Sequence, residues 1–259
     1  MTQLAGRNAV VTGAGRGIGA AIARALAAAG ARVVLTSRTN RQLEQVAGEI
    51  RATGQQAIVL PCEVSDPKSV AELALLISEQ LGSVDILVNN AGIALSGPLG
   101  RTTLEQWNRL LAVNATGAFL CTQAFLPGMV ARRWGRIIYV ASVAGLTGGK
   151  YIAAYAASKH AVLGLCRSAA AEVADSGVTV NAVCPGYVDT DMTQESIDRI
   201  VEKTGKTREQ ALAAILATTP QRRLIAPEEV AHAVVSLCDN QAAGINGDAL
   251  VIDGGALLR

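Results

Sequence analysis

The sequence predicts an α/β fold in which a doubly wound parallel sheet of about seven strands carries helices on both faces. Short apolar runs rich in β-branched residues alternate along the chain with amphipathic segments of helical period. The runs are nearly continuously apolar, as in strands that are buried on both faces. No linker, repeat or low-complexity tract interrupts the pattern, so we expect a single domain over residues 1–259.

The elements follow from these runs and from the turn residues between them. Expected strands cover 9–12, 32–36, 57–61, 86–89, 136–141, 179–184 and 249–252. Expected helices cover 18–29, 40–53, 67–80, 110–131, 153–174 and 227–238. Ligands of such sheets bind beyond the carboxyl ends of the strands, so a site is expected at that edge.

The first strand leads into a glycine-rich turn and then into a long alanine-rich helix. The turn reads Gly13-Ala14-Gly15-Arg16-Gly17-Ile18-Gly19. Glycines let the backbone approach a pyrophosphate, and the helix N-terminus offers unpaired N–H groups and a partial positive charge. The alternative is a tight turn without a ligand. The number of glycines exceeds what such a turn needs, so the pattern favours a dinucleotide site.

The stretch 110–131 has no charged residue and is long enough to cross a bilayer. It also contains residues that suit a bilayer poorly, namely Asn114, Thr116, Thr122, Gln123 and Pro127. We therefore expect a helix buried at a sheet face or a subunit interface and no membrane association. The segment 1–8 is polar and lacks the features of a signal peptide.

Composition excludes several classes of protein. The chain has a net charge of +2 and 3% aromatic residues, without a basic block, so nucleic-acid binding is not expected. Five scattered cysteines without a CxxC motif suggest reduced thiols in a cytoplasmic protein. The two histidines, His160 and His232, have no companion ligands nearby in the sequence, so no metal site is expected.

Tyr155 and Lys159 lie four residues apart in the helix expected over 153–174, and therefore on one face of it. A nearby ammonium lowers the pKa of a phenol towards the range in which it can exchange a proton near neutral pH. Such pairs also occur by chance. Tyr151 is an alternative candidate for the acid, but only Tyr155 has a lysine one turn later. Tyr151 is instead expected to line the substrate pocket.

The segment 193–219 predicts two short helices joined by a glycine-containing turn. Thr207 suits an N-cap, and Gln210 could complete a capping box. We interpret the segment as a mobile substrate lid that excludes water; an ordinary surface insertion is the alternative. A lid of this length suits an extended acyl thioester. Four nearby basic residues could meet the phosphates of such a substrate or simply face solvent: Lys203, Lys206, Arg222 and Arg223.

Several further motifs occur in order along the chain: Asn89-Asn90-Ala91-Gly92, Ser142, the Tyr155/Lys159 pair and Pro185-Gly186. Together with the glycine turn they make the chain resemble the short-chain dehydrogenase/reductase family over essentially its whole length. The runs 180–192 and 251–255 are most similar to 3-oxoacyl-thioester and polyketide ketoreductases. The resemblance implies a Rossmann-type sheet.

The resemblance also implies four catalytic roles. Tyr155 exchanges a proton with the substrate oxygen, and Lys159 lowers the tyrosine pKa and binds the nicotinamide ribose. Ser142 holds the substrate oxygen, or else merely caps the turn after its strand. Asn114 fixes a water in a proton relay from Lys159, or else merely bonds backbone groups inside its helix.

The resemblance further implies which residues bind the cofactor. Glu63 stands where the family usually has an aspartate beside the adenine, Asn90 lies against the adenosine ribose, and Thr190 binds the nicotinamide carboxamide. The complete expected set is Gly13, Gly15, Arg16, Gly17, Ile18, Gly19, Ser37, Arg38, Glu63, Val64, Asn90, Ala91, Gly92, Tyr155, Lys159, Pro185, Gly186, Val188 and Thr190.

The second strand favours NADP(H) over NAD(H). NAD sites usually place a carboxylate near the end of this strand, but none appears here before Glu44. Arg38 and Arg16 could instead flank a 2′-phosphate, with a hydrogen bond from Ser37. The alternative is that both arginines are ordinary surface charges.

These observations predict an NADPH-dependent carbonyl reductase or alcohol dehydrogenase that acts on a small-molecule ketone, with a 3-oxoacyl thioester favoured. The alternatives are an NADP(H)-linked dehydrogenase of a cyclic or other secondary alcohol and, from another class, a non-catalytic dinucleotide sensor or scaffold. An intact Ser142, Tyr155 and Lys159 set argues against the sensor. The family further implies a homotetramer formed through helices 104–130 and 153–174 and the last strand.

Overall fold

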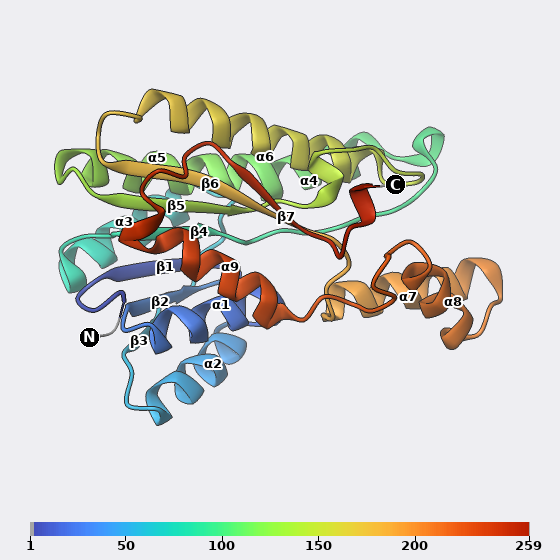
Figure 1. Cartoon of the computed structure of the whole chain (residues 1–259), viewed down its shortest axis with the longest axis horizontal. Helices are drawn as coiled ribbons and strands as arrows, with labels where there is room; N and C mark the ends of the chain where they lie inside the picture. The colour runs from blue at the N-terminus through green and yellow to red at the C-terminus, as the bar shows by residue number, and fades with distance from the viewer. Residues whose placement is uncertain (1–2, 259) are drawn as a thin grey trace.

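A computed structural model describes residues 3–258 and contains one parallel sheet with the strand order β3-β2-β1-β4-β5-β6-β7 (Figure 1). The strands are β1 (Asn8–Thr12), β2 (Arg32–Thr36), β3 (Ala57–Val59), β4 (Ile86–Asn89), β5 (Gly135–Val140), β6 (Val178–Pro185) and β7 (Ala249–Ile252). The expected α/β fold is confirmed. Because β1 pairs with both β2 and β4, the strand order reverses beside β1, which is where such sheets bind ligands.

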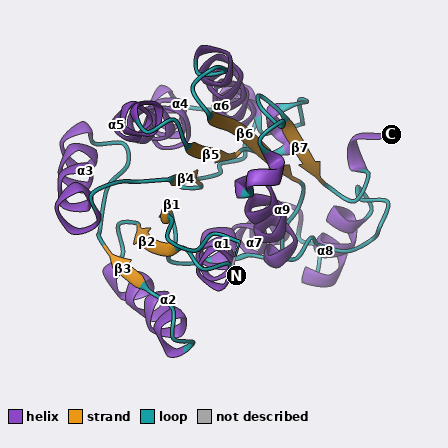
Figure 2. Cartoon of the chain, turned by 60° about the vertical axis from the view of Figure 1, so that its left-hand side comes forward, coloured by secondary structure: helices purple, strands orange, loops and turns teal. Residues whose placement is uncertain are grey.

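Helices cover both faces of the sheet (Figure 2). Their bounds are α1 (Gly17–Ala28), α2 (Asn40–Ala52), α3 (Pro67–Leu81), α4 (Leu104–Leu111), α5 (Gly117–Ala131), α6 (Ala153–Glu172), α7 (Asp191–Thr204), α8 (Arg208–Leu216) and α9 (Pro227–Cys238). Helices α1, α2 and α9 lie on one face, and α3, α5 and α6 lie on the other.

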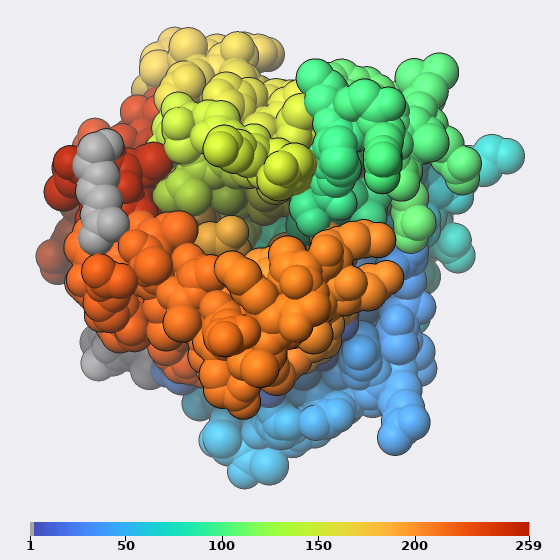
Figure 3. Space-filling view, turned by 90° about the vertical axis from the view of Figure 1, so that its right-hand side faces the viewer, coloured from blue at the N-terminus to red at the C-terminus, as the bar shows by residue number. Residues whose placement is uncertain are grey.

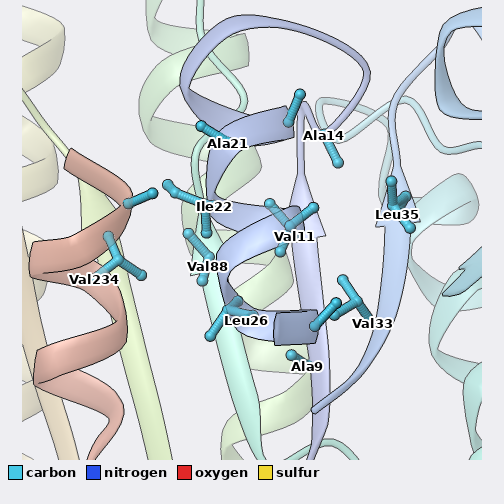
Figure 4. Close-up of a cluster of buried hydrophobic side chains, with 14 of the residues drawn as sticks. Ala9, Val11, Ala14, Ala21, Ile22, Leu26, Val33, Leu35, Val88 and Val234 are labelled. Atoms are coloured by element: carbon cyan, nitrogen blue, oxygen red, sulfur yellow. The ribbon is translucent and has the colours of Figure 1, made fainter. Parts of the chain in front are cut away.

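Each face of the sheet has its own hydrophobic core. On one side, Ile22 and Leu26 of α1 and Val234 of α9 are fully buried over Val11 and Val88 (Figure 4). Burying each such side chain contributes roughly 1.5–3 kcal/mol relative to leaving it exposed. These cores hold the carboxyl ends of the strands at one edge.

The uncharged stretch around α5 belongs to a longer helical segment. Leu104–Ala131 is the one described stretch that is long and apolar enough to cross a membrane, judged by length and composition. In the fold its Cys121 and Met129 are fully buried in the core on the α3 side of the sheet. A helix packed on a sheet face meets the same criterion, but only 39% of the apolar window is buried in the single chain, so the expected burial at a sheet face is partial.

A π-helical turn, Ala112–Thr116, separates α4 from α5. The sequence predicts no such irregularity. A π turn widens the helix by one residue and often occurs at functional sites. Here it contains Asn114.

Helices α7 and α8 form a hairpin that projects from the body of the molecule (Figure 1, right). Ile197, Ala211 and Ile215 form a small separate core between them. Thr207 and Gln210 form the expected capping box at the start of α8. At the base, backbone hydrogen bonds join Ile225 to both sides of Val188, so the two ends of the segment are tied together.

Candidate active site

A cavity of about 440 Å³ opens at the carboxyl ends of the central strands. It is lined by every residue expected to bind the cofactor, from Gly13 of the glycine turn to Thr190 at the start of α7. Further lining residues that the sequence analysis did not single out include Thr39, Gln42, Cys62, Asp191 and Met192. The motifs are separated by up to 177 positions in the sequence, and the sheet brings them into one pocket.

The glycine turn is shaped for close approach of a ligand. Gly13 and Gly17 have φ values of +65° and +52°, which favour glycine. A Cβ at Gly19 would lie 2.2 Å from the carbonyl oxygen of Gly13, so no side chain fits there. Helix α1 has no side-chain cap and no acidic residue in its first turn, which leaves its N-terminus suited to a phosphate. The turn therefore fits the pyrophosphate of a dinucleotide.

Asn90 and Thr12 hold this turn against the end of β4. The amide nitrogen of Asn90 donates to the carbonyl oxygens of Thr12 (2.9 Å) and Gly13 (3.1 Å). The Thr12 hydroxyl accepts from the backbone N–H groups of Asn90 and Ala91, both at 3.0 Å. Thr12 was not expected from the sequence, where the available signal was a threonine that ends an otherwise apolar strand.

Tyr155 and Lys159 lie on α6 and line the same cavity as Ser142, which follows β5. The Lys159 ammonium lies 5.9 Å from the centre of the Tyr155 ring and donates to the carbonyl oxygen of Val140 at 2.9 Å. Only 6% of Lys159 is exposed. Burial lowers the pKa of Lys159 to about 8, because a charged amine is poorly solvated inside the fold.

Contrary to the expectation that Lys159 lowers it, the pKa of Tyr155 is raised above its usual value, chiefly by burial. A hydrogen bond with Ser142 opposes this effect, and Tyr187 adds to it. At neutral pH the side chain is therefore a phenol that can donate its proton.

Ser142 does cap the turn after its strand, which is one of the two roles that the sequence left as alternatives. Its hydroxyl oxygen accepts from the backbone N–H of Ala144 at 3.1 Å and so caps the short turn Val143–Gly145. A hydroxyl has one hydrogen to donate and two lone pairs, so the cap leaves the hydrogen free. The same side chain also hydrogen-bonds Tyr155. The cap thus fixes the oxygen, and the remaining proton is directed at Tyr155, whose pKa this bond lowers.

Asn114 lies beneath the cavity rather than on its wall and is 2% exposed. Its Oδ1 accepts from the N–H of Ile93 at 2.8 Å, and its Nδ2 donates to the Ile93 carbonyl at 3.0 Å and to the Ser158 hydroxyl at 2.9 Å. The side chain therefore does bond the backbone. A Cβ at Gly92 would lie 3.3 Å from Asn114 Oδ1 and 3.6 Å from Lys159 Nζ, which shows how closely these groups meet.

The two arginines expected beside a 2′-phosphate both line the cavity, and both are ion-paired. Arg38 lies 3.6 Å from Glu63, while Arg16 lies 3.2 Å from Asp191 and 3.7 Å from Glu195. Ser37 accepts a hydrogen bond from the N–H of Thr39. These pairs were not expected from the sequence.

The remaining tyrosines occupy different surroundings. Tyr139 is fully buried in the core, where burial raises its pKa. Tyr151 is 63% exposed and does not line the described cavity, unlike the expectation from the sequence. Tyr187 is 42% exposed and lies close enough to influence Tyr155.

The hairpin of α7 and α8 spans the face onto which the cavity opens (Figure 3, orange). Asp191, Met192 and Thr193 at its start line the cavity. Farther along α7, Arg199 donates to the Ser96 hydroxyl at 3.0 Å, which ties the hairpin to the loop after β4.

Comparison with known proteins agrees with this geometry. The family model described as short chain dehydrogenase matches residues 7–200. D-beta-hydroxybutyrate dehydrogenase of Rhizobium meliloti is 37% identical over 96% of this chain and 98% of its own length. The 3-oxoacyl-(acyl-carrier-protein) reductase FabG of Escherichia coli is 39% identical over 96% of this chain and 97% of its own length.

Among solved structures, a variant of actinorhodin polyketide ketoreductase with NADPH matches with a TM-score of 0.94 and 37% sequence identity. The match covers 96% of this chain and 97% of the ketoreductase.

Proposed function

Because this chain belongs to the short-chain dehydrogenase/reductase family and is an oxidoreductase of CH–OH and keto groups, we propose that it reduces 3-oxoacyl thioesters with NADPH. The observation that carries the proposal is that Ser142, Tyr155 and Lys159 line the same cavity as the glycine turn.

The proposed chemistry assigns one role to each side chain. A bound nicotinamide supplies the hydride. The Tyr155 phenol transfers its proton to the substrate oxygen as negative charge develops there. Ser142 donates a hydrogen bond to that oxygen, and its own oxygen is held by the Ala144 N–H. The Lys159 ammonium stabilises the phenolate that remains, and Asn114 keeps the backbone around Ile93 in place beside it.

The chain's own residues support NADP(H) as the proposed cofactor. No carboxylate follows β2 before Glu44, and Arg38 lies in the cavity wall beside Ser37. A guanidinium matches the charge and geometry of a phosphate. The polyketide ketoreductase to which the chain is similar is described with NADPH.

The α7–α8 hairpin is consistent with an extended substrate in the proposed reaction. It forms its own small core, and it contacts the opposite rim through Arg199 and Ser96. We therefore assign it the role of a lid that closes over the acyl chain and excludes water. A second candidate is oxidation of a short 3-hydroxy acid, which the similarity to D-beta-hydroxybutyrate dehydrogenase favours.

The same proposal includes a cytoplasmic homotetramer. Leu104, Trp107, Phe119 and Val130 of α4 and α5 are at least 36% exposed in the single chain. Large apolar side chains along one helical segment indicate a surface that another copy covers.

NADPH consumption with acetoacetyl-CoA tests the proposal. We expect turnover by the wild type and a loss of about 10³-fold in Tyr155→Phe, because the phenylalanine has no proton to give. Tyr151→Phe is the matched control, because Tyr151 lies in the turn before α6 and is 63% exposed, and it should retain activity. Binding of NADPH without turnover of acetoacetyl-CoA would contradict the thioester assignment, and turnover of 3-hydroxybutyrate instead would support the second candidate.

A further inference from the structure

Two arginines stand at the rim where the 2′-phosphate of NADP(H) would bind, and each already faces a carboxylate. Arg38 pairs with Glu63, and Arg16 pairs with Asp191 and Glu195. A 2′-phosphate carries a charge of about −2 and would have to share both guanidiniums with these groups. This part of the cavity should therefore bind a phosphate more weakly than its two arginines alone suggest.

The three carboxylates differ in how firmly they are held. Asp191 and Glu195 belong to α7, and their side chains are 65% and 58% exposed. Glu63 is 36% exposed and is fixed by a neighbour, because the Ser65 N–H and hydroxyl both donate to its Oε1. That leaves Oε2 directed at Arg38, 3.6 Å from Nη1.

The backbone fixes the two sides of this pair relative to each other. The N–H of Cys62 donates to the carbonyl oxygen of Ser37 at 3.1 Å, which ties the residue before Glu63 to the residue before Arg38. The Ser69 hydroxyl accepts from the N–H of Glu63 at 3.0 Å. These bonds hold the backbone, and the Glu63 carboxylate cannot turn away from Arg38 without breaking its two hydrogen bonds with Ser65.

We infer that Glu63 sets the cofactor preference of this enzyme by acting as a fixed countercharge to Arg38. The inference rests on the proposed NADP(H) site and assigns a second property to it. Glu63 weakens binding of the 2′-phosphate, so the enzyme accepts NADH as well as NADPH. It leaves the 2′-OH of NADH largely unaffected, since an uncharged hydroxyl does not depend on the guanidinium charge that Glu63 neutralises.

The ratio of the dissociation constants for NADPH and NADH tests this inference, measured by fluorescence titration without substrate. In Glu63→Gln, which keeps the shape and removes the charge, we expect the preference for NADPH to rise by about fivefold, as is typical for removal of one partly exposed charge. The rise should come from tighter NADPH binding. Glu44→Gln, which breaks the exposed Glu44–Arg51 pair elsewhere, is the control and should leave the ratio unchanged.

A double variant tests whether Glu63 acts on the cofactor preference through Arg38. In Arg38→Gln the effect of Glu63→Gln on the ratio should fall to about twofold or less, because the pair has then lost its positive member. If Glu63→Gln weakens both cofactors equally, Glu63 serves the adenine or the fold and the inference is wrong. Failure to reduce acetoacetyl-CoA would contradict the proposed function alone, since the binding ratio is read without turnover.

Discussion

Lys159 is a buried cation, and burial makes its protonation depend on folding. Its pKa is lowered to about 8 from an ordinary value of 10.5. Between these values the unfolded chain binds a proton that the folded chain does not. The penalty on the folded state is therefore full below pH 8 and is relieved as the pH rises towards 10.5.

We therefore expect Lys159→Met to raise the Tm at pH 7 and to lose most of this gain by about pH 10. The penalty removed is on the order of 3 kcal/mol. Thermal unfolding followed by circular dichroism across this range measures it. Lys150→Met is the control, because Lys150 is exposed and should show no such dependence. A gain for Lys159→Met that does not change with pH would contradict the burial argument.

The Ser142–Tyr155 hydrogen bond has a separate consequence for pH dependence. In the proposed chemistry, oxidation of an alcohol needs the phenolate of Tyr155, and the bond with Ser142 lowers the pKa of that phenol. In Ser142→Ala we expect the rise of kcat/KM for oxidation to move to higher pH and the maximum rate to fall by about 10²-fold. Reduction, which needs the phenol, should also slow because the substrate oxygen loses the Ser142 hydrogen bond, but the acidic side of its pH profile should not shift. Profiles of both directions decide this, with the distant Ser236→Ala as the control.

At the scale of single elements, the π turn between α4 and α5 is held by Asn114. Three hydrogen bonds join this side chain to Ile93 and Ser158. Leucine has a similar volume but leaves the Ile93 N–H and carbonyl without these partners. We expect Asn114→Leu to lower the free energy of unfolding by about 3 kcal/mol, measured by urea denaturation. Asn108→Leu on the exposed side of α4 is the control. An unchanged midpoint would show that the π turn does not depend on Asn114.

Most elements could be predicted because buried strands and amphipathic helices have strong periodic signals. The expected strands 32–36, 86–89 and 249–252 match β2, β4 and β7. The third strand ends at Val59, two residues early, since Pro61 has no N–H for the ladder of an edge strand. The π turn left no signal, because one extra residue in an almost wholly apolar helix does not change its pattern.

The residues that line the cavity were predictable for a related reason. Parallel strands place the residues that follow them at one edge of the sheet. The positions of Gly13, Asn90, Ser142 and Thr190 directly after strands were therefore enough to predict that they line one cavity. The ion pairs at the rim were not predictable. Arg16 and Asp191 are 175 positions apart, and their contact depends on where the α7–α8 hairpin lies.

For the whole molecule, the exposed apolar side chains of α4 and α5 predict self-association. Sedimentation of the wild type should give four times the chain mass of 26.7 kDa. Phe119 is 45% exposed near the middle of this surface. We expect Phe119→Lys to give dimers or monomers, because a buried unpaired charge opposes assembly. Leu75→Lys on α3 is the control, since Leu75 is 59% exposed outside these helices. A monomeric wild type would contradict the proposed tetramer.

The position of β1 in the interior of the sheet also has a consequence for synthesis on the ribosome. Residues 9–11 are fully buried between β2 and β4, yet β4 leaves the ribosome more than 70 residues after β1. Until then the nascent chain presents an apolar strand edge of the kind that aggregates or recruits chaperones. The pocket draws on residues from 13 to 193, so the cofactor cannot assist these early steps. Its binding stabilises only the completed fold, by about 2.7 kcal/mol at a hundred times the Kd.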